Sequence, residues 1–170
     1  VPEDSVVNGL DVESVYEVPL MFHQQNLDNI IMTYLQMWTG SPKLQPWIDL
    51  IEKYKNPQDE VDIAFIGKYV AHLDSYESLK EALLHGGIAN RLKVKLHYID
   101  SEFLTPENAF EQLEKMDGVL VAPGFGERGM EGKITAIQIA RTGNIPFFGI
   151  CLGMQMAIVE FARNVVGIAG

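Results

Sequence analysis

The sequence has a single cysteine, few basic residues and no long apolar run. One cysteine cannot form an internal disulfide, and a transmembrane helix needs about 20 consecutive apolar residues. The beginning of the chain also lacks the charged and hydrophobic blocks of a signal peptide. With 13 basic against 23 acidic residues, the formal net charge is −10, which disfavours binding to nucleic acids and to anionic membranes. We therefore expect a cytoplasmic protein that binds neither.

The lone cysteine lies at the centre of the motif Gly149-Ile150-Cys151-Leu152-Gly153, between an apolar run and a segment typical of a helix. In a G-x-nucleophile-x-G turn a buried strand reverses into a helix, and the glycines allow the strained backbone that exposes the nucleophile. The helix N-terminus then faces the sulfur and favours the reactive thiolate. The motif predicts that Cys151 is a nucleophile. The alternative is a buried cysteine that acts as a small hydrophobic side chain.

The 170 residues are enough for one domain, or for one domain with an extension. From about residue 61 onward, short β-branched apolar runs alternate with amphipathic segments, which predicts an α/β fold with a parallel sheet and flanking helices. The predicted strands are residues 61–67, 93–99, 118–122 and 144–150, with the second strand towards a sheet edge. The predicted helices before the cysteine are residues 75–89, 105–116 and 132–141.

Local signals set the ends of these helices. Asp74 followed by Glu77 resembles a capping box, and Thr105-Pro106 has the N-cap and first-turn pairing. The second of these helices is expected to turn Phe110 and Leu113 inward. Gly143 is expected to cap the third helix at its C-terminus.

A glycine-rich loop, Pro123-Gly124-Phe125-Gly126-Glu127-Arg128-Gly129, follows the third predicted strand. In a parallel sheet it lies at the same edge as Cys151, where such folds bind ligands. A thiolate that attacks an acyl carbon needs hydrogen-bond donors where negative charge develops on oxygen. We interpret the loop as part of an oxyanion hole; a plain connecting turn is the alternative.

Together the two loops resemble the glutaminase domain of the CTP synthase family, within the class I glutamine amidotransferases. The motifs are Pro-Gly-Phe-Gly before Glu-Arg-Gly, then Glu-Gly-Lys-Ile at 131–134 and Gly-Ile-Cys-Leu-Gly-Met-Gln at 149–155. The resemblance extends over nearly the whole chain. It includes residues 11–20, 25–28, 67–69, 75–78, 85–91 and 99–101. It implies a flavodoxin-like class I glutaminase fold, incomplete in this chain and preceded by a helical linker.

The resemblance implies a two-domain enzyme that makes CTP from UTP, ATP and L-glutamine, with ATP and Mg²⁺ needed by the full-length enzyme and no cofactor within this chain. Cys151 would form a glutamyl thioester and release ammonia to the amidoligase half. The family is also expected to form a homotetramer, mainly through that half. No metal site is expected among the residues of the chain.

The same resemblance assigns roles to individual positions. Gly124 and Leu152 match the two backbone donors of the oxyanion hole, and Gln155 matches a glutamine-binding side chain. Phe125 matches an aromatic residue that borders the same pocket, although a packing role is equally compatible with its position. At the start of the chain, Leu10-Asp11-Val12 matches the segment that borders the ATP adenine.

The chain departs from the family pattern in three places. Pro123 stands where a glycine is usual and has no N–H to donate, so the hole must use Gly124. Leu10 replaces a frequent lysine. The family's catalytic histidine and glutamate belong to a His-x-Glu segment that would follow residue 170, and His72 is the one histidine here placed to approach the site. We therefore expect a C-terminally truncated fragment that does not turn over glutamine alone.

The resemblance also divides the chain. Residues 1–37 would end the amidoligase domain, 38–57 would form an interdomain linker helix, and 58–170 would form the N-terminal part of the glutaminase domain. No G-x-x-x-x-G-K-[ST] phosphate-binding motif is present. The phosphate-binding part of the amidoligase is therefore expected before Val1.

Two other functions stay open at this point. One is a different class I glutaminase or a γ-glutamyl hydrolase, which would release glutamate without any dependence on a nucleotide. The other is a non-enzymatic flavodoxin-like module, in which Cys151 would be inert.

Overall fold

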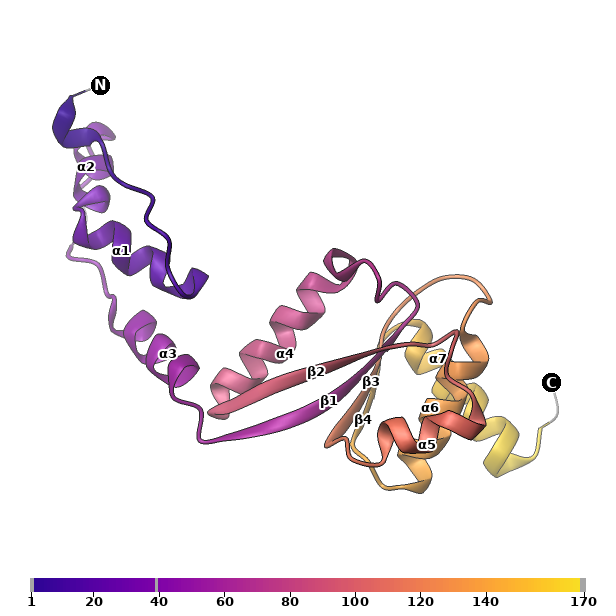
Figure 1. Ribbon diagram of the computed structural model, residues 1–170. Coiled ribbons are helices and arrows are strands. Elements are labelled where there is room, and N and C mark those ends of the chain that lie inside the picture. Colours follow the sequence, from indigo (N-terminus) through magenta and orange to yellow (C-terminus); the bar gives the residue numbers. More distant parts are fainter. Residues whose placement is uncertain (1, 39, 169–170) are drawn as a thin grey trace. The chain divides into compact units, whose positions relative to one another are not determined.

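The computed structural model describes residues 2–38 and 40–168 (Figure 1). The chain divides into two compact units, Val1–Pro57 and Gln58–Gly170. Within the described residues, no helix is both long and apolar enough to cross a membrane.

In its described residues, the first unit is helical. Two 3-10 turns, Glu3–Ser5 and Val15–Glu17, accompany three α-helices. The helices are α1 (Val18–Gln24), α2 (Leu27–Tyr34) and α3 (Gln45–Lys55).

The third helix is tied to the segment before α1. The ammonium of Lys55 pairs with the carboxylate of Glu13 at 2.8 Å and also with that of Glu17. The ring of Tyr54 packs edge-on against that of Tyr16, with centroids 5.9 Å apart. Helix α3 is therefore held to the rest of its own unit by both charge and ring packing.

The described part of the second unit contains a parallel sheet in the order β2-β1-β3-β4. Its strands are β1 (Asp59–Gly67), β2 (Leu92–Asp100), β3 (Gly118–Val121) and β4 (Phe147–Gly149). The predicted α/β class, the parallel sheet and the edge position of the second strand are confirmed. The strand order is that of flavodoxin-like folds.

Two helix layers cover this sheet, as Figure 1 shows. Helix α4 (Glu77–Ala89) lies on one face, where Phe65 and Leu120 form a small core with Tyr76. The other face is covered by α5 (Pro106–Leu113), α6 (Met130–Thr142) and α7 (Leu152–Phe161).

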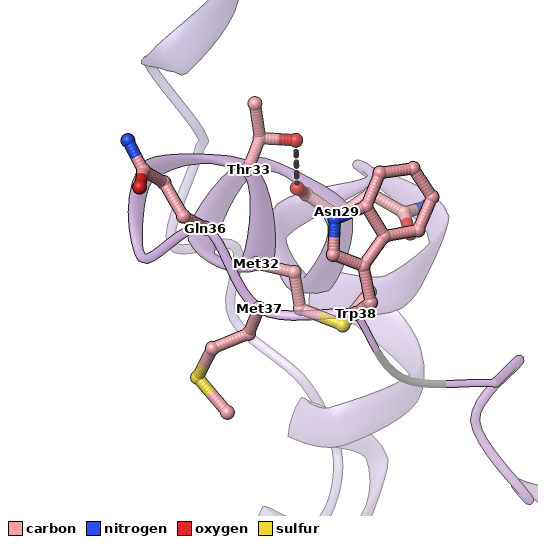
Figure 2. Close-up of a pocket in the computed structure, with 6 residues that line it drawn as sticks. All are labelled: Asn29, Met32, Thr33, Gln36, Met37 and Trp38. Carbon is pink, nitrogen blue, oxygen red and sulfur yellow. Dashed lines mark hydrogen bonds between the residues drawn. The ribbon is translucent and has the colours of Figure 1, made fainter.

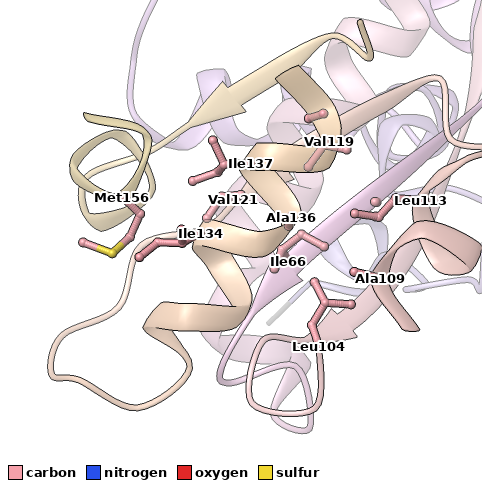
Figure 3. Packing of buried hydrophobic residues seen from close by; sticks show 12 residues of the cluster. Ile66, Leu104, Ala109, Leu113, Val119, Val121, Ile134, Ala136, Ile137 and Met156 are labelled. Atoms are coloured by element: carbon pink, nitrogen blue, oxygen red, sulfur yellow. The ribbon is translucent and has the colours of Figure 1, made fainter. Parts of the chain in front are cut away.

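The larger core lies under these three helices, and Figure 3 shows its packing. It joins side chains of β1 and β3 to the inner faces of α5, α6 and α7. Its buried members are Ala64, Ile66, Leu104, Ala109, Leu113, Val119, Val121, Ile134, Ala136, Ile137, Ala140 and Met156. This packing fixes the carboxyl ends of β3 and β4 side by side, which is where the two predicted functional loops begin.

The capping box predicted at Asp74 and Glu77 is wrong. Helix α4 begins at Glu77 after a 3-10 turn, Leu73–Tyr76, and its N-cap residue Tyr76 makes no side-chain capping hydrogen bond. Tyr76 instead inserts its ring beside that of Phe65, with centroids 5.1 Å apart. Burial of this ring, rather than a cap, sets the path of the chain into the helix.

The inward position predicted for Phe110 is also wrong, since its side chain is 61% exposed. The inner face of α5 is formed by Ala109 and Leu113, which are four residues apart and both fully buried. Pro106 does open the helix after Thr105, as predicted, but the helix ends at Leu113 rather than near Met116.

The fourth strand is shorter than predicted. The N–H groups of Asn144 and Ile145 donate to the carbonyls of Arg141 and Ala140, so this stretch closes the end of α6 instead of extending the sheet. Gly143 is the C-cap, as predicted, but with right-handed backbone. The left-handed residue that turns the chain is Asn144, with φ of +53°.

Candidate active site

Cys151 lies in the sharp turn between β4 and α7. It is the N-cap residue of α7 and has φ of +53° and ψ of −107°, a conformation that a non-glycine residue rarely adopts. Its side chain is exposed to solvent. A strained and exposed residue at a strand-to-helix turn is the arrangement predicted for a nucleophile, and the buried-cysteine alternative is wrong.

The two glycines of the motif are required by close packing of backbone on backbone. A Cβ on Gly149 would lie 2.7 Å from the carbonyl carbon of Gly153, and a Cβ on Gly153 would lie 2.2 Å from the oxygen of Val121. Neither position can hold a side chain unless the strand or the helix moves. The glycines thus hold the turn tightly enough to present Cys151.

The loop after β3 is anchored through its carbonyl groups. The ammonium of Lys133, in the first turn of α6, donates to the oxygen of Ala122 at 2.8 Å. The hydroxyl of Tyr76 donates to the oxygen of Pro123 at 3.4 Å. The predicted oxyanion donor is the N–H of Gly124. The carbonyls of the two preceding residues, Ala122 and Pro123, are therefore both held by hydrogen bonds.

Lys68, directly after β1, packs along the same loop. Its side chain is 5% exposed, and a Cβ on Gly124 would lie 3.0 Å from its Cε. The guanidinium of Arg128 donates to the Lys68 carbonyl at 3.2 Å and to the carboxylate of Glu102 at 3.0 Å. The loops that follow β1, β2 and β3 are therefore connected to one another at this edge of the sheet.

The electrostatics of the site centre on Lys133, whose side chain is fully buried. Burial lowers the pKa of Lys133 to about 8, and the positive charge of Lys68 acts in the same direction. The interaction with Cys151 partly offsets both effects. Lys133 and Cys151 are thus electrostatically coupled.

The structure also places three other residues of the predicted site, namely Leu152, Gln155 and Phe125. Leu152 is the first residue of α7, where helical N–H groups have no partner within the helix, and its side chain packs against the core. Gln155 is exposed, one turn further along α7. Phe125 is 86% exposed, so its packing alternative is wrong.

The predicted adenine-binding segment lies in the first unit. Leu10, Asp11 and Val12 occupy irregular chain before the turn Val15–Glu17, and Leu10 and Asp11 are exposed.

The histidines occupy other places. His97 contacts Asp62 across β2 and β1, and β2 is three strand spacings, about 14 Å, from β4. His85 lies beside Glu81 on α4, and His23 bonds to Asp28 in the first unit. His72 is exposed in the loop after β1. Within the second unit, Cys151 therefore draws no base from His85 or His97.

A cavity of about 660 Å³ lies in the first unit (Figure 2). Among the residues the structure describes, its lining includes Met32, Met37 and Trp38 but no cysteine and no ionisable side chain. Among the described residues, no group of histidine, cysteine, aspartate and glutamate side chains is arranged to hold a metal ion. The chemistry of the described chain therefore concentrates at Cys151.

Sequence reasoning assigned no role to Lys133 or Lys68. A signal for Lys133 was present, because it is spaced three, four and seven residues from Ala136, Ile137 and Ala140, which form the inner face of α6. A lysine on an apolar helical face is a buried charge and requires an explanation.

The sequence profile of the family described as "Glutamine amidotransferase class-I" matches residues 71–169, more than half of the chain. The chain belongs to the class I glutamine amidotransferase family. Over 99% of its length, the chain is 52% identical to the CTP synthase of Desulfotalea psychrophila and 54% identical to that of Geobacter metallireducens. Each match covers 31% of the relative, so the chain spans about a third of the length of the curated relatives it matches.

A solved structure is also similar to the chain. The glutaminase domain of Trypanosoma brucei CTPS with bound acivicin is 45% identical to it, with a TM-score of 0.60 over 63% of this chain and 42% of that one. The similarity confirms the predicted class I glutaminase fold. Together with the curated relatives, it confirms the predicted resemblance to the glutaminase region of CTP synthases.

Proposed function

We propose that this chain carries the nucleophile of the glutaminase half of a CTP synthase, which makes CTP from UTP, ATP and L-glutamine. The observation that carries the proposal is Cys151: exposed, at positive φ, and held between two glycines that pack on backbone. The whole-chain identity to CTP synthases favours this activity over that of another glutaminase or a γ-glutamyl hydrolase.

In the proposed reaction, the Cys151 thiolate attacks the side-chain carboxamide carbon of glutamine. The carbonyl electron pair moves onto oxygen, and the N–H groups of Gly124 and Leu152 donate to this oxyanion. When the adduct collapses, the amide nitrogen takes up a proton, the C–N bond breaks and ammonia leaves, which yields a glutamyl thioester. Water then releases glutamate and the free thiol. Each backbone donor is worth about 3 to 4 kcal/mol of barrier.

Gln155 and Phe125 are assigned to the glutamine substrate. Gln155 projects from α7 one turn beyond the nucleophile, and Phe125 is exposed on the oxyanion loop. Both therefore have side chains that a substrate can cover.

In the full-length enzyme, ATP with Mg²⁺ activates UTP by phosphorylation, and ammonia from the glutaminase half then displaces the phosphate. Leu10, Asp11 and Val12 are assigned to the border of the adenine site. We assign residues 1–37 to the end of the amidoligase domain, 38–57 to the linker and 58–170 to the glutaminase domain. The division of the structure after Pro57 supports the last boundary. The assembly proposed is a cytoplasmic homotetramer.

The base that accepts and returns protons is assigned to a His-x-Glu segment outside these residues. The positions of His85 and His97 support this assignment, since each lies beside a carboxylate on α4 or β2, away from the Cys151 turn. We therefore expect the 170-residue chain alone not to turn over glutamine.

Replacing Cys151 in the full-length protein tests the proposal. Cys151→Ser is expected to abolish glutamine-dependent formation of CTP while leaving formation from ammonia intact, since ammonia bypasses the thioester. A glutamine-mimicking electrophile should label Cys151 in the unchanged protein. Release of glutamate with no nucleotide dependence would favour a plain glutaminase, and an unlabelled Cys151 would contradict any thiol mechanism.

A further inference from the structure

Lys133 is a buried cation that the proposed reaction does not use. Its side chain is fully buried in the first turn of α6, and its Nζ donates to the carbonyl of Ala122. Burying an ammonium is costly unless it is paired with an opposite charge. Among the described residues no carboxylate pairs with Lys133, and its helical neighbour Glu131 is instead exposed and bound to Arg163.

The hydrogen bond to Ala122 places this cation at the edge of the sheet that carries the nucleophile. The N–H of Ile150 donates to the carbonyl of Val121 at 3.0 Å, so Ala122 and Ile150 are the next residues along two adjacent strands. Cys151 follows Ile150 directly. The Lys133 ammonium therefore lies beside the end of β3, one strand from the turn that presents the sulfur.

Two charged or ionisable groups act on Lys133 from the neighbouring elements. Lys68, after β1, disfavours its protonated form, and Cys151, before α7, favours it. In general, a fixed positive charge near a thiol favours its thiolate form. Lys68 and Lys133 are both buried, so their charges are weakly screened from one another.

We propose that Lys133 is a positioning residue of the glutaminase site, whose positive charge, fixed by the Ala122 carbonyl, stabilises the thiolate of Cys151. The inference rests on the proposed role of Cys151 as the nucleophile. It explains why a cation is retained on an apolar face that Ala136, Ile137 and Ala140 otherwise form. At neutral pH Lys133 is mostly protonated, since its pKa is about 8.

The test is the rate at which iodoacetamide alkylates Cys151 between pH 5 and pH 10, followed by mass spectrometry of its peptide in the full-length protein. Lys133→Met removes the charge at nearly constant volume. Lys133→Gln also removes the charge but keeps a donor for the Ala122 carbonyl. We expect both variants to react about tenfold more slowly at pH 7, with the profile midpoint moved up by about one pH unit.

Lys133→Arg retains the charge and is expected to restore much of the rate. The matched control is Arg163→Met, which removes one positive charge from an exposed pair with the adjacent Glu131. It is expected to leave the rate within about twofold, because exposed charges are screened.

Superimposable profiles for the unchanged protein and a folded Lys133→Gln variant would overturn the inference, whether or not Lys133→Met folds. If instead Cys151 of the unchanged protein reacts no faster than a thiol in urea-unfolded protein, the proposed function itself fails. The two failures are therefore distinguishable.

Discussion

The conformation of Cys151 depends on residues that have no side chain. Positive φ at a non-glycine residue costs on the order of 1–3 kcal/mol, which the surrounding packing must supply. Of the two glycines in the motif, Gly153 gives the closer approach, since a Cβ on it would lie 2.2 Å from the oxygen of Val121. The strained backbone of Cys151 therefore depends on the absence of a side chain at Gly153.

Gly153→Ala is therefore expected to destabilise the fold by about 3 kcal/mol and to slow alkylation of Cys151. The new Cβ would lie 2.2 Å from the Val121 oxygen, and a central strand cannot give way cheaply. Urea unfolding and the iodoacetamide rate measure the two effects. Met154→Ala, which shortens an exposed side chain on the same helix, is the control. Equal stabilities of the two variants would contradict the packing argument.

Lys133 has a second measurable consequence, in the pH dependence of stability. Its pKa falls from 10.5 in the unfolded chain to about 8 in the fold. Below pH 8 both states hold the proton, and the full cost of burying the ammonium opposes folding. Between pH 8 and 10.5 the unfolded state binds more protons, so this cost is relieved by about 3 kcal/mol as the pH rises.

Lys133→Met should abolish this increase in the free energy of unfolding between pH 8 and 10.5. The free-energy difference between the variant and the parent, from urea unfolding, is expected to change by about 3 kcal/mol between pH 7.5 and 10.5, in favour of the parent. Cys151→Ser in both proteins removes the single thiol of the sequence from the comparison. A free-energy difference that does not vary with pH would show that burial does not lower the pKa of Lys133.

At the residue scale, prediction from sequence succeeded where the structure depends on residues that are close together in the chain. The strained turn at Cys151 follows from a local pattern of two glycines around one nucleophile, and the structure confirms it. The contact of Lys133 with Ala122 joins residues of a helix and a strand that only the fold brings together. A polar residue in a helical pattern is normally read as solvent-exposed, which is why Lys133 was missed.

At the scale of the element, α4 contains two adjacent glycines with opposite surroundings. A Cβ on Gly86 would meet nothing within 4 Å, whereas one on Gly87 would lie 2.6 Å from a methyl of Val94 and 2.7 Å from the carbonyl of Leu92. Helix α4 thus packs on β2 through Gly87, and Gly86 lies on its open side.

Substitutions at these two positions should therefore have opposite signs. Gly86→Ala is expected to stabilise the fold by about 1 kcal/mol, because alanine is the better helix former. Gly87→Ala is expected to destabilise it by about 2 kcal/mol, because the helix must move off β2. Thermal unfolding of the two variants is the measurement, each acting as the other's control. Two shifts of the same sign would contradict the packing of α4.

Helices α6 and α7 are joined by an ion pair. Arg141 donates to both carboxylate oxygens of Glu160, at 2.7 Å and 3.0 Å, and Glu160 is 1% exposed. Asn164 also donates to Glu160, and the hydrogen bond from Arg141 is the main cause that lowers the pKa of this carboxyl. The pair therefore fixes the C-terminal end of α7, the helix that follows Cys151.

Arg141→Leu is expected to cost about 3–5 kcal/mol, because a buried carboxylate is left without its partner. Removal of the exposed pair by Arg163→Met should cost less than about 1 kcal/mol. Since the pKa of Glu160 is depressed, the stability it contributes is present above its ordinary pKa of 4.5 and is lost as the pH falls below that value. Urea unfolding at pH 7 and pH 3.5 checks both statements. A cost of Arg141→Leu that is no smaller at pH 3.5 than at pH 7 would contradict them.

At this scale the sequence indicated the existence and order of the strands and helices, because hydrophobic periodicity is itself the cause of burial. It was less successful with their ends. Tyr76 replaces the predicted cap by inserting a ring into the core, and Asn144 and Ile145 bond to α6 instead of extending β4. Both differences depend on contacts between elements, which a local pattern does not contain.

At the scale of the whole molecule, the two units differ in how much they bury. The second unit has two apolar cores, on the two faces of its sheet. In the described part of the first unit, Ser14 and Tyr16 are the buried side chains, while Ile31, Tyr34 and Leu35 are exposed. A segment of this size with so small an interior is expected to be marginally stable.

In the 170-residue chain, amide hydrogen exchange is therefore expected to be fast throughout the first unit and slowest in β1 and β3, which open only with the core. Phe65→Ala, at a fully buried position between the rings of Tyr76 and Tyr98, should cost about 3–5 kcal/mol and speed exchange in β1 and β3. It should leave exchange in α1, α2 and α3 unchanged, because those helices have their own contacts. Parallel acceleration in α3, measured by mass spectrometry of its peptides, would show that the units unfold as one and would contradict their separation after Pro57.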